Sequence, residues 1–158
     1  MISADYIVGL TDGEGCFYVN LRPPDKSLFR VNFSVETHFY IKMRADELKL
    51  LEKVKKFFGC GAIYLQKEKR LNHSVCYRFE INAQRDIHEV LIPFFDKHSL
   101  QSAKKKNYLI FRRIAVLFKN RDHLKPGEVV KEITKLKSQM NLGARRVRES
   151  RSLGGNAK

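Results

Sequence analysis

Hydrophobic and polar residues alternate along several short segments of the chain, and this period of two predicts β-strands with one buried face. In residues 16–22, Phe17, Val19 and Leu21 alternate with small or polar neighbours. Three further segments fit strands: 30–36, 63–66 and 74–82. The four segments predict two antiparallel pairs, the first of them joined by a turn at Pro23-Pro24-Asp25.

Apolar residues recur at helical spacing elsewhere in the chain. Residues 44–58 place their large apolar side chains on one face, and Gly59 is suited to end that helix. Residues 3–13 predict a shorter helix with Ser3 as its N-cap. Pro126 stands where the first turn of the last helix tolerates proline. The remaining helical segments lie at about 85–97, 104–120 and 126–141.

The order of these elements is helix, two strands, helix, two strands, then helices. This order predicts an α+β fold in which the helices cover the apolar face of an antiparallel sheet. A length of 158 residues suits one domain, which we expect at 1–142. The basic segment 143–158 reads as a flexible tail.

The net charge of +14 indicates a polyanionic partner. Residues 104–158 carry 16 basic against 4 acidic residues, so this third supplies most of the charge. A charge that serves only solubility is the alternative, and the lack of a balancing acidic face argues against it.

No apolar run reaches the ~20 residues of a membrane span, and the N-terminus shows no secretory signal, so we expect no membrane partner. The cysteines, Cys16, Cys60 and Cys76, are odd in number and never spaced as CxxC. They indicate reduced thiols in an intracellular compartment.

The second face of the predicted sheet is rich in arginine, amide and tyrosine side chains. These types supply the donors and acceptors that read base edges in the major groove of DNA, although an ordinary hydrated sheet face is the alternative. The residues predicted to contact DNA are Tyr18, Asn20, Arg22, Arg30, Asn32, Ser34, Tyr64, Gln66, Arg78 and Glu80.

Two glycines lie four residues apart on one face of the first helix, at Gly9 and Gly13. Each costs about 1 kcal/mol relative to alanine, and the close approach of a second helix would explain both. Use of Gly13 and Gly15 as helix caps is the alternative, but it leaves Gly9 unexplained. If two such helices crossed about a twofold axis, the two Glu14 carboxylates would lie side by side, where divalent cations such as Mg²⁺ would offset their repulsion.

The segment IVGLTDGEG (7–15) resembles the motif of the LAGLIDADG homing endonucleases. Further blocks are similar to single-motif members, in the same order along the chain. They are FFGCGAIY (57–64), YRFEIN (77–82), IPFFDKHSL (92–100), the KKK that begins a helix at 104–106, and DHLKPGEVVKEI with a later MN (122–141). The resemblance covers nearly all of the chain up to residue 142.

The resemblance implies a role for each motif residue. Glu14 would bind the catalytic divalent metals, with the backbone of Gly13 assisting. Asp12 would hold the end of the helix, and Lys104, or else Lys105, would contact the solvent network of the active site. The motif helix would form the interface of a homodimer through Val8, Gly9, Asp12 and Gly13.

Many members carry a glutamine after the second strand that helps to position the attacking water. The matching place here is Thr37, which gives a predicted catalytic set of Glu14, Lys104 and Thr37. This match treats residues 39–44 as extra sequence between the strand and the helix. The neighbouring His38 could act through a water, and a surface or packing role is its alternative.

The resemblance therefore implies a site-specific homing endonuclease that binds a long pseudo-palindromic double-stranded DNA site. With Mg²⁺ (Mn²⁺ or Ca²⁺ in the same sites), it would hydrolyse one phosphodiester on each strand and leave 3′ overhangs. An RNA maturase that binds intron RNA in group I splicing is the first alternative, and a DNA-binding regulator that does not cut is the second. The compartment would be an organelle or a prokaryotic cytoplasm.

Overall fold

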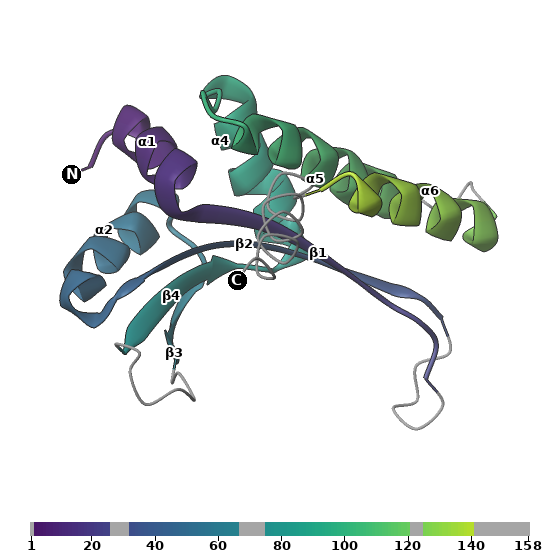
Figure 1. The fold of residues 1–158 in the computed structure, drawn as a ribbon, viewed down its shortest axis with the longest axis horizontal. Coiled ribbons are helices and arrows are strands. Elements are labelled where there is room, and N and C mark those ends of the chain that lie inside the picture. Colours follow the sequence, from purple (N-terminus) through teal and green to yellow (C-terminus); the bar gives the residue numbers. More distant parts are fainter. Residues whose placement is uncertain (1, 26–31, 67–74, 121–124, 141–158) are drawn as a thin grey trace, which may run out of the picture.

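One antiparallel sheet of four strands forms the centre of the molecule, with the strand order β1-β2-β4-β3 (Figure 1). The computed structural model describes residues 2–25, 32–66, 75–120 and 125–140. The strands are β1 (Gly15–Arg22), β2 (Ser34–Arg44), β3 (Ala62–Gln66) and β4 (Cys76–Ile81). The α+β class predicted from the order of elements is confirmed.

Strand β2 is longer than the sequence pattern predicted, and it starts later than residue 30. Residues 39–44 are not extra sequence, because they pair with β4 from Phe39 opposite Ile81 to Arg44 opposite Cys76. The reason is visible in the alternation, which continues beyond Thr37 with buried residues at every second position. Thr37 is a single polar residue on the buried side, and it made the strand look shorter than it is.

Helices account for most of the remaining described chain. They are α1 (Ala4–Glu14), α2 (Leu48–Phe58), α3 (Gln84–Asp86), α4 (Ile92–Lys97), α5 (Lys104–Lys119) and α6 (Pro126–Ser138), with a short 3₁₀ helix η2 (Ala45–Glu47) and a π-helical turn η3 (Ile87–Leu91). No helix in the described ranges is long and apolar enough to cross a membrane. The predicted tail at 143–158 lies outside the described residues.

The predicted helix signals are present in the structure. The Ser3 hydroxyl accepts a hydrogen bond from the Tyr6 amide at 3.1 Å and begins α1. Gly59 ends α2 with a φ of 66°, a left-handed conformation that favours glycine. Pro126 begins α6, where its missing N–H would have no intrahelical partner.

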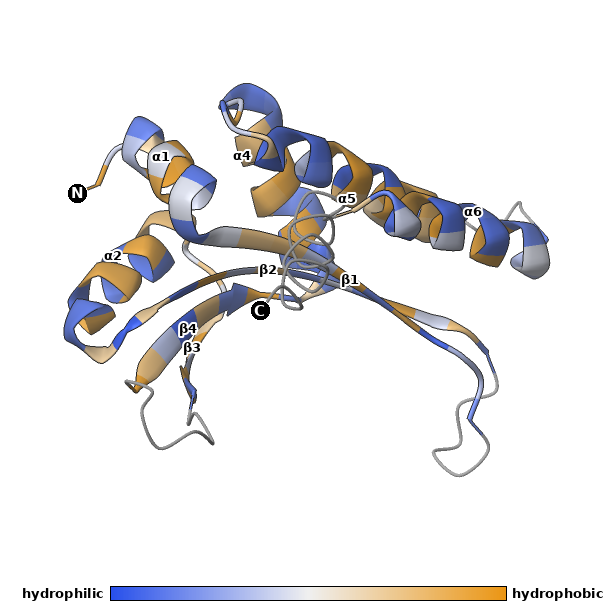
Figure 2. Cartoon of the chain, viewed as in Figure 1, coloured by the Kyte–Doolittle hydropathy of each residue, from blue (hydrophilic) through white to orange (hydrophobic). Residues whose placement is uncertain are grey.

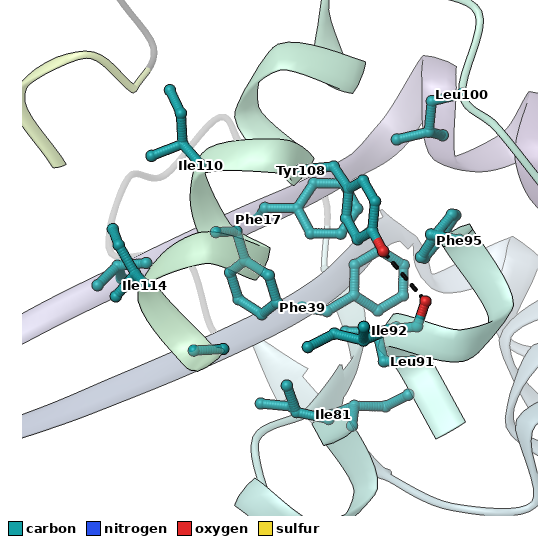
Figure 3. Packing of buried hydrophobic residues seen from close by; sticks show 14 of the residues in the cluster. Phe17, Phe39, Ile81, Leu91, Ile92, Phe95, Leu100, Tyr108, Ile110 and Ile114 are labelled. Atoms are coloured by element: carbon teal, nitrogen blue, oxygen red, sulfur yellow. Dashed lines mark hydrogen bonds between the residues drawn. The ribbon is translucent and has the colours of Figure 1, made fainter. Parts of the chain in front are cut away.

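Aromatic side chains hold the helical layer on the sheet. The ring of Phe17 in β1 lies 5.2–5.4 Å from the rings of Phe39, Phe95, Tyr108 and Phe111 (Figure 3). The Tyr108 hydroxyl lies 2.6 Å from Asp96 Oδ1 and 3.1 Å from the Ile92 carbonyl oxygen, so its O–H group has an acceptor at the edge of the core. This packing fixes α5 across β1 and thereby places the beginning of α5 close to the end of α1.

Candidate functional site

The first helix runs directly into the first strand at Glu14 and Gly15. The Gly15 amide still donates to the Thr11 carbonyl oxygen, so no loop separates α1 from β1. A Cβ at Gly15 would lie 2.6 Å from Thr11 Cγ2, and this contact requires glycine. Glu14 is therefore held at the junction of helix and sheet, and its side chain is exposed.

Lys104, the first residue of α5, reaches the end of α1. Its Nζ donates to the Gly13 carbonyl oxygen at 2.7 Å and to the Thr11 carbonyl oxygen at 3.1 Å. The last turn of α1 has no basic residue of its own, so Lys104 supplies the positive charge that a helix C-terminus favours. Burial lowers the pKa of Lys104, and the neighbouring Glu14 carboxylate opposes this shift.

The structure distinguishes Lys104 from the alternative, Lys105. Lys105 is exposed and lines a groove between α5 and α6 together with Lys106 and Leu109. It therefore lies on a different side of α5 from the end of α1. The geometry favours Lys104 as the basic residue of this site.

Asp12 holds the segment that precedes α5. Its carboxylate accepts hydrogen bonds from the Gln101 amide at 2.9 Å, the Ser102 amide at 3.2 Å and the Ser102 hydroxyl at 2.6 Å. Burial opposes ionisation, but these hydrogen bonds outweigh it and lower the pKa of Asp12. The carboxylate thus ties α1 to the start of α5 and keeps Lys104 in place, as the expected role at the helix end requires.

The oxygen atoms at this junction fit a divalent cation. Glu14 offers an exposed carboxylate, and the Gly13 carbonyl already accepts a cationic group, the Lys104 ammonium. Hard cations such as Mg²⁺ prefer oxygen ligands of these two kinds and keep several waters. Among the described residues no three His, Cys, Asp or Glu side chains gather as a metal cage. One subunit therefore offers a partial site, which a phosphate oxygen could complete.

The glycines of α1 face open space. A Cβ at Gly9 or Gly13 would meet no atom within 4 Å in the described part of the chain. Packing within the subunit therefore does not require glycine at either position. Val8, Gly9 and Asp12 line a surface groove together with Lys97 at the end of α4 and residues of the segment that follows it.

The polar face of the sheet brings together the predicted DNA-contacting residues that lie in strands. Tyr18 stands opposite His38 in the β1–β2 register, and Arg78 stands opposite Tyr64 in the β3–β4 register. Helices α1, α4, α5 and α6 all lie on the other side of the sheet (Figure 1). The predicted residues that share this face are Tyr18, Asn20, Arg22, Ser34, Tyr64, Gln66, Arg78 and Glu80.

The structure does not place the two remaining predicted residues, Arg30 and Asn32, in strands that it describes. Asn32 precedes β2 and is exposed, and Arg30 is outside the described residues. Hydrophobic and hydrophilic residues alternate along β1 and β2 (Figure 2), as a sheet with one covered face requires.

Glu80 differs from the expectation of a side chain free to contact DNA. It is only 5% exposed, and its carboxylate is bound by Arg78 Nη2 at 2.8 Å and by His38 Nδ1. The sequence pattern placed Glu80 on the correct face but could not show that neighbouring strands cover it. In this structure Glu80 is thus bound to two protein side chains and leaves little surface for direct contact with a base.

Thr37 also differs from its predicted place. Its side chain is 1% exposed, lies on the core side of β2 opposite Val19, and accepts a hydrogen bond from Gln84 Nε2 at 2.9 Å. The β2 residue opposite Gly15 is Ile41, four residues further along the strand. Thr37 is therefore not brought to Glu14, and its hydroxyl serves the core rather than a reacting group.

The predicted DNA-contacting set left out four polar residues of β2 that share this face: Glu36, His38, Tyr40 and Lys42. Glu36 binds Arg22 Nε at 2.9 Å and Asn20 Nδ2 at 3.2 Å. Glu36 already lay in the predicted strand 30–36, and the alternation that continues to Arg44 is the signal that could have placed His38, Tyr40 and Lys42 beside it. With these residues included, the polar face of the sheet carries basic and acidic side chains that pair with one another, such as Arg22 with Glu36 and Arg78 with Glu80.

A family model described as LAGLIDADG endonuclease matches residues 7–115. The probable intron-encoded endonuclease 2 of Neurospora crassa is 30% identical over 120 residues, which is 76% of this chain but only 24% of that protein. The chain thus spans about a quarter of the length of this curated relative.

Two solved structures show the same architecture. The homing endonuclease I-TnaI superposes with a TM-score of 0.74 at 29% identity, covering 96% of this chain and 97% of that one. I-SmaMI bound to uncleaved DNA target in the presence of calcium ions also gives 0.74 at 29% identity, covering 88% of this chain and 45% of that one. Together with a family model that spans more than half of the sequence, these likenesses show that the chain belongs to the LAGLIDADG endonuclease family.

Proposed function

We propose that this chain is a site-specific homing endonuclease that cuts double-stranded DNA as a homodimer with the help of divalent cations. The observation that carries the proposal is the exposed Glu14 carboxylate at the end of α1, next to the Gly13 carbonyl and the Lys104 ammonium. The carboxylate can hold divalent cations, and those cations together with the ammonium can stabilise the negative charge that develops on the phosphate during hydrolysis.

The polar face of the sheet is the proposed DNA-binding surface. Arginine, asparagine and glutamine side chains on it are donors suited to purine edges in the major groove. I-SmaMI, which has the same architecture, is described bound to a DNA target, and this supports the assignment. The excess of basic residues after position 103 adds attraction to phosphates whatever the base sequence.

Glu14 and the Gly13 carbonyl would hold the metal ions. When bound there, divalent cations supply a Lewis acid that polarises the phosphate and lowers the pKa of a water molecule. Lys104 would place its ammonium beside the phosphate, and Asp12 would keep α5 in position for that contact. Calcium ions accompany DNA in the I-SmaMI structure, which supports divalent metal use; Mg²⁺ is our choice, with Mn²⁺ or Ca²⁺ able to occupy the same sites.

A second copy of the chain is the proposed partner at α1. Gly9 and Gly13 leave room for a helix backbone, and one Glu14 in each copy would serve one DNA strand. The match to this chain covers 97% of I-TnaI but only 45% of the longer I-SmaMI. The rest of the I-SmaMI chain is long enough for a second unit of similar size, which supports a pair of such units here. A dimer implies a nearly palindromic target, with one phosphodiester hydrolysed on each strand and 3′ overhangs.

Nothing in the described part of the chain favours an RNA maturase over this activity. The intron-encoded name of the Neurospora relative supports a gene that lies within an intron. Such a protein would act inside the cell or organelle that carries the intron.

Cleavage of a randomised duplex library tests the proposal. The chain would be incubated with the library and Mg²⁺, and the cut ends would be sequenced, with EDTA and the Glu14→Gln variant as controls. We expect one family of pseudo-palindromic sites, cut on both strands with 3′ overhangs, and no cutting in either control. Absence of cutting with Mg²⁺, Mn²⁺ and Ca²⁺ alike, or equal cutting by Glu14→Gln, would contradict the proposal.

A further inference from the structure

We propose that Arg78 reads a guanine in each half of the DNA target, and that Glu80, itself fixed by His38, is the positioning residue that orients it. This inference rests on the proposed function and names a specificity determinant of the same DNA-binding surface. It assigns different tasks to two residues that the sequence placed in one undivided set of DNA contacts.

Arg78 is restrained in two directions. Its Nη2 binds Glu80 Oε2 at 2.8 Å. Its Cζ lies over the ring of Tyr40, 5.2 Å from the ring centre. Arginine normally loses much rotamer freedom when it binds a base, and a side chain already held in place loses less.

Glu80 is suited to hold Arg78 and unsuited to contact a base. A carboxylate that is 5% exposed must be paired, because an unpaired buried charge is strongly unfavourable. Arg78 binds one of its oxygens and His38 Nδ1 the other. Both oxygens are thus bound inside the protein. Arg78 is the most exposed of the three side chains, at 31% against 21% for His38 and 5% for Glu80.

A second arginine on the same face provides a comparison. Arg22 binds Glu36 at 2.9 Å, but the two side chains are 48% and 30% exposed, and the pair belongs to β1, at the edge of the sheet, and the neighbouring β2. Exposed ion pairs hold their geometry weakly. Of these two arginine–glutamate pairs, Arg78–Glu80 is the one with a buried carboxylate, which restrains its guanidinium more firmly.

The free part of the guanidinium fits guanine. Arg78 Nε is buried and has no hydrogen-bond partner within the described structure, so the N–H groups able to reach outward are on the two terminal nitrogens. A pair of terminal N–H groups matches the O6 and N7 acceptors of guanine in the major groove. Adenine offers a donor in place of O6 and would be rejected.

Base preference at each position of the selected DNA target tests this assignment. In wild-type protein, we expect guanine to be preferred by about 5- to 150-fold at one symmetric pair of positions. Arg78→Ala should reduce that preference to less than about 3-fold while the other positions keep theirs. Arg78→Gln should move the preference toward adenine, because glutamine pairs with the N6 and N7 edge of adenine.

Glu80→Gln separates positioning from folding. The amide has the shape of the carboxylate but lacks its charge, so Arg78 would be held less firmly, and the guanine preference should fall at the same positions and nowhere else. A merely structural role would lower the melting temperature and weaken binding evenly across the site. An even loss of that kind would overturn the role given to Glu80.

Arg113→Ala is the matched control. Arg113 on α5 binds Glu132 on α6 at 2.7 Å, so the variant removes the same charge from an arginine–glutamate pair in the helical layer. It should leave base preference unchanged at every position. If Arg78→Ala also leaves base preference unchanged at every position, the assignment of Arg78 is overturned although the proposed function stands. If wild-type protein selects no duplex sequence at all, the proposed function and this inference both fail.

Discussion

Two glutamates mark two regions of the molecule with opposite electrostatic arrangements. At the end of α1, Glu14 is exposed and makes no hydrogen bond or ion pair within the described residues, although the Lys104 charge is near. On the polar face of the sheet, Glu80 is buried, and both of its oxygens are bound by Arg78 and His38. The same side chain can thus be left available for a cation or be committed to holding another residue.

The surroundings explain the difference. Glu14 lies between Gly13 and Gly15, which have no side chains to cover it, and it stands at a helix C-terminus whose carbonyl groups attract cations. Glu80 lies in an inner strand, where side chains from β2 and β4 meet on one face. We infer that the helix end is arranged for chemistry and that the sheet face is arranged for recognition.

Replacement of Glu14 should have the largest effect on cleavage. Glu14→Gln removes a proposed metal ligand, and a loss of several kcal/mol of transition-state stabilisation slows cutting by about 10³-fold or more. DNA binding should stay equal or tighten, because a negative charge near phosphate is gone. Single-turnover cleavage and a binding titration measure the two effects, with Glu132→Gln on α6 as control. If Glu14→Gln cut DNA at a rate within tenfold of wild type, the end of α1 could not be assigned to chemistry in contrast to the sheet face.

Replacement of Lys104 should have the next largest effect. Lys104→Ala removes the ammonium beside Glu14 and should slow cleavage by about 10²-fold, as the loss of one preorganised donor does elsewhere. Lys105→Ala removes the same charge one residue later, from the exposed groove between α5 and α6, and should stay within about threefold of wild type. Equal losses of cleavage rate in both variants would show that cleavage depends on the overall positive charge of α5 and not on the contact of Lys104 with the end of α1.

Bulk on the open face of α1 should weaken the dimer. Gly9→Leu would force the two helices apart, and overpacking of about 1–3 kcal/mol raises the dimer dissociation constant by about 5- to 150-fold. Gly127→Leu on α6 is the control, since Gly127 also faces open space within the described chain. Sedimentation measures both variants. An unchanged dissociation constant for Gly9→Leu would place the interface elsewhere.

Replacement of Thr37 should have the smallest effect. Thr37→Val keeps the volume and loses the hydrogen bond from the exposed Gln84, which costs about 0.5–1.5 kcal/mol of unfolding free energy. Cleavage should remain within about twofold of wild type. A tenfold loss of cleavage at an unchanged melting temperature would return Thr37 to the catalytic set.

The helix end was more predictable from the sequence than the sheet face. Caps, glycines and the motif are local signals, so the bounds of α1 and the exposure of Glu14 follow from neighbouring residues. Lys104 follows Gly13 by 91 positions, and only the resemblance to a family linked the two. The structure supplies the physical reason for that link, because packing of α5 on Phe17 brings its first residue to α1.

The pairing of charges on the sheet could not be read from one strand at a time. Alternation assigns a face to Glu80 and Arg78, but the contact with His38 depends on the register between β2 and β4. Thr37 shows the same limit, since a polar residue at a buried position interrupts the pattern that defines the strand. At both positions, partners from distant parts of the sequence decide how far the side chain is buried.

Manganese binding to the protein–DNA complex tests most directly whether the Glu14 carboxylate is available for a cation. Electron paramagnetic resonance of Mn²⁺ counts bound ions in wild-type protein and in Glu14→Gln, each held on an uncleavable duplex of the selected target. We expect tight Mn²⁺ binding in the wild-type complex and its loss in Glu14→Gln. Equal Mn²⁺ binding by both complexes would contradict the role of Glu14 as a metal ligand.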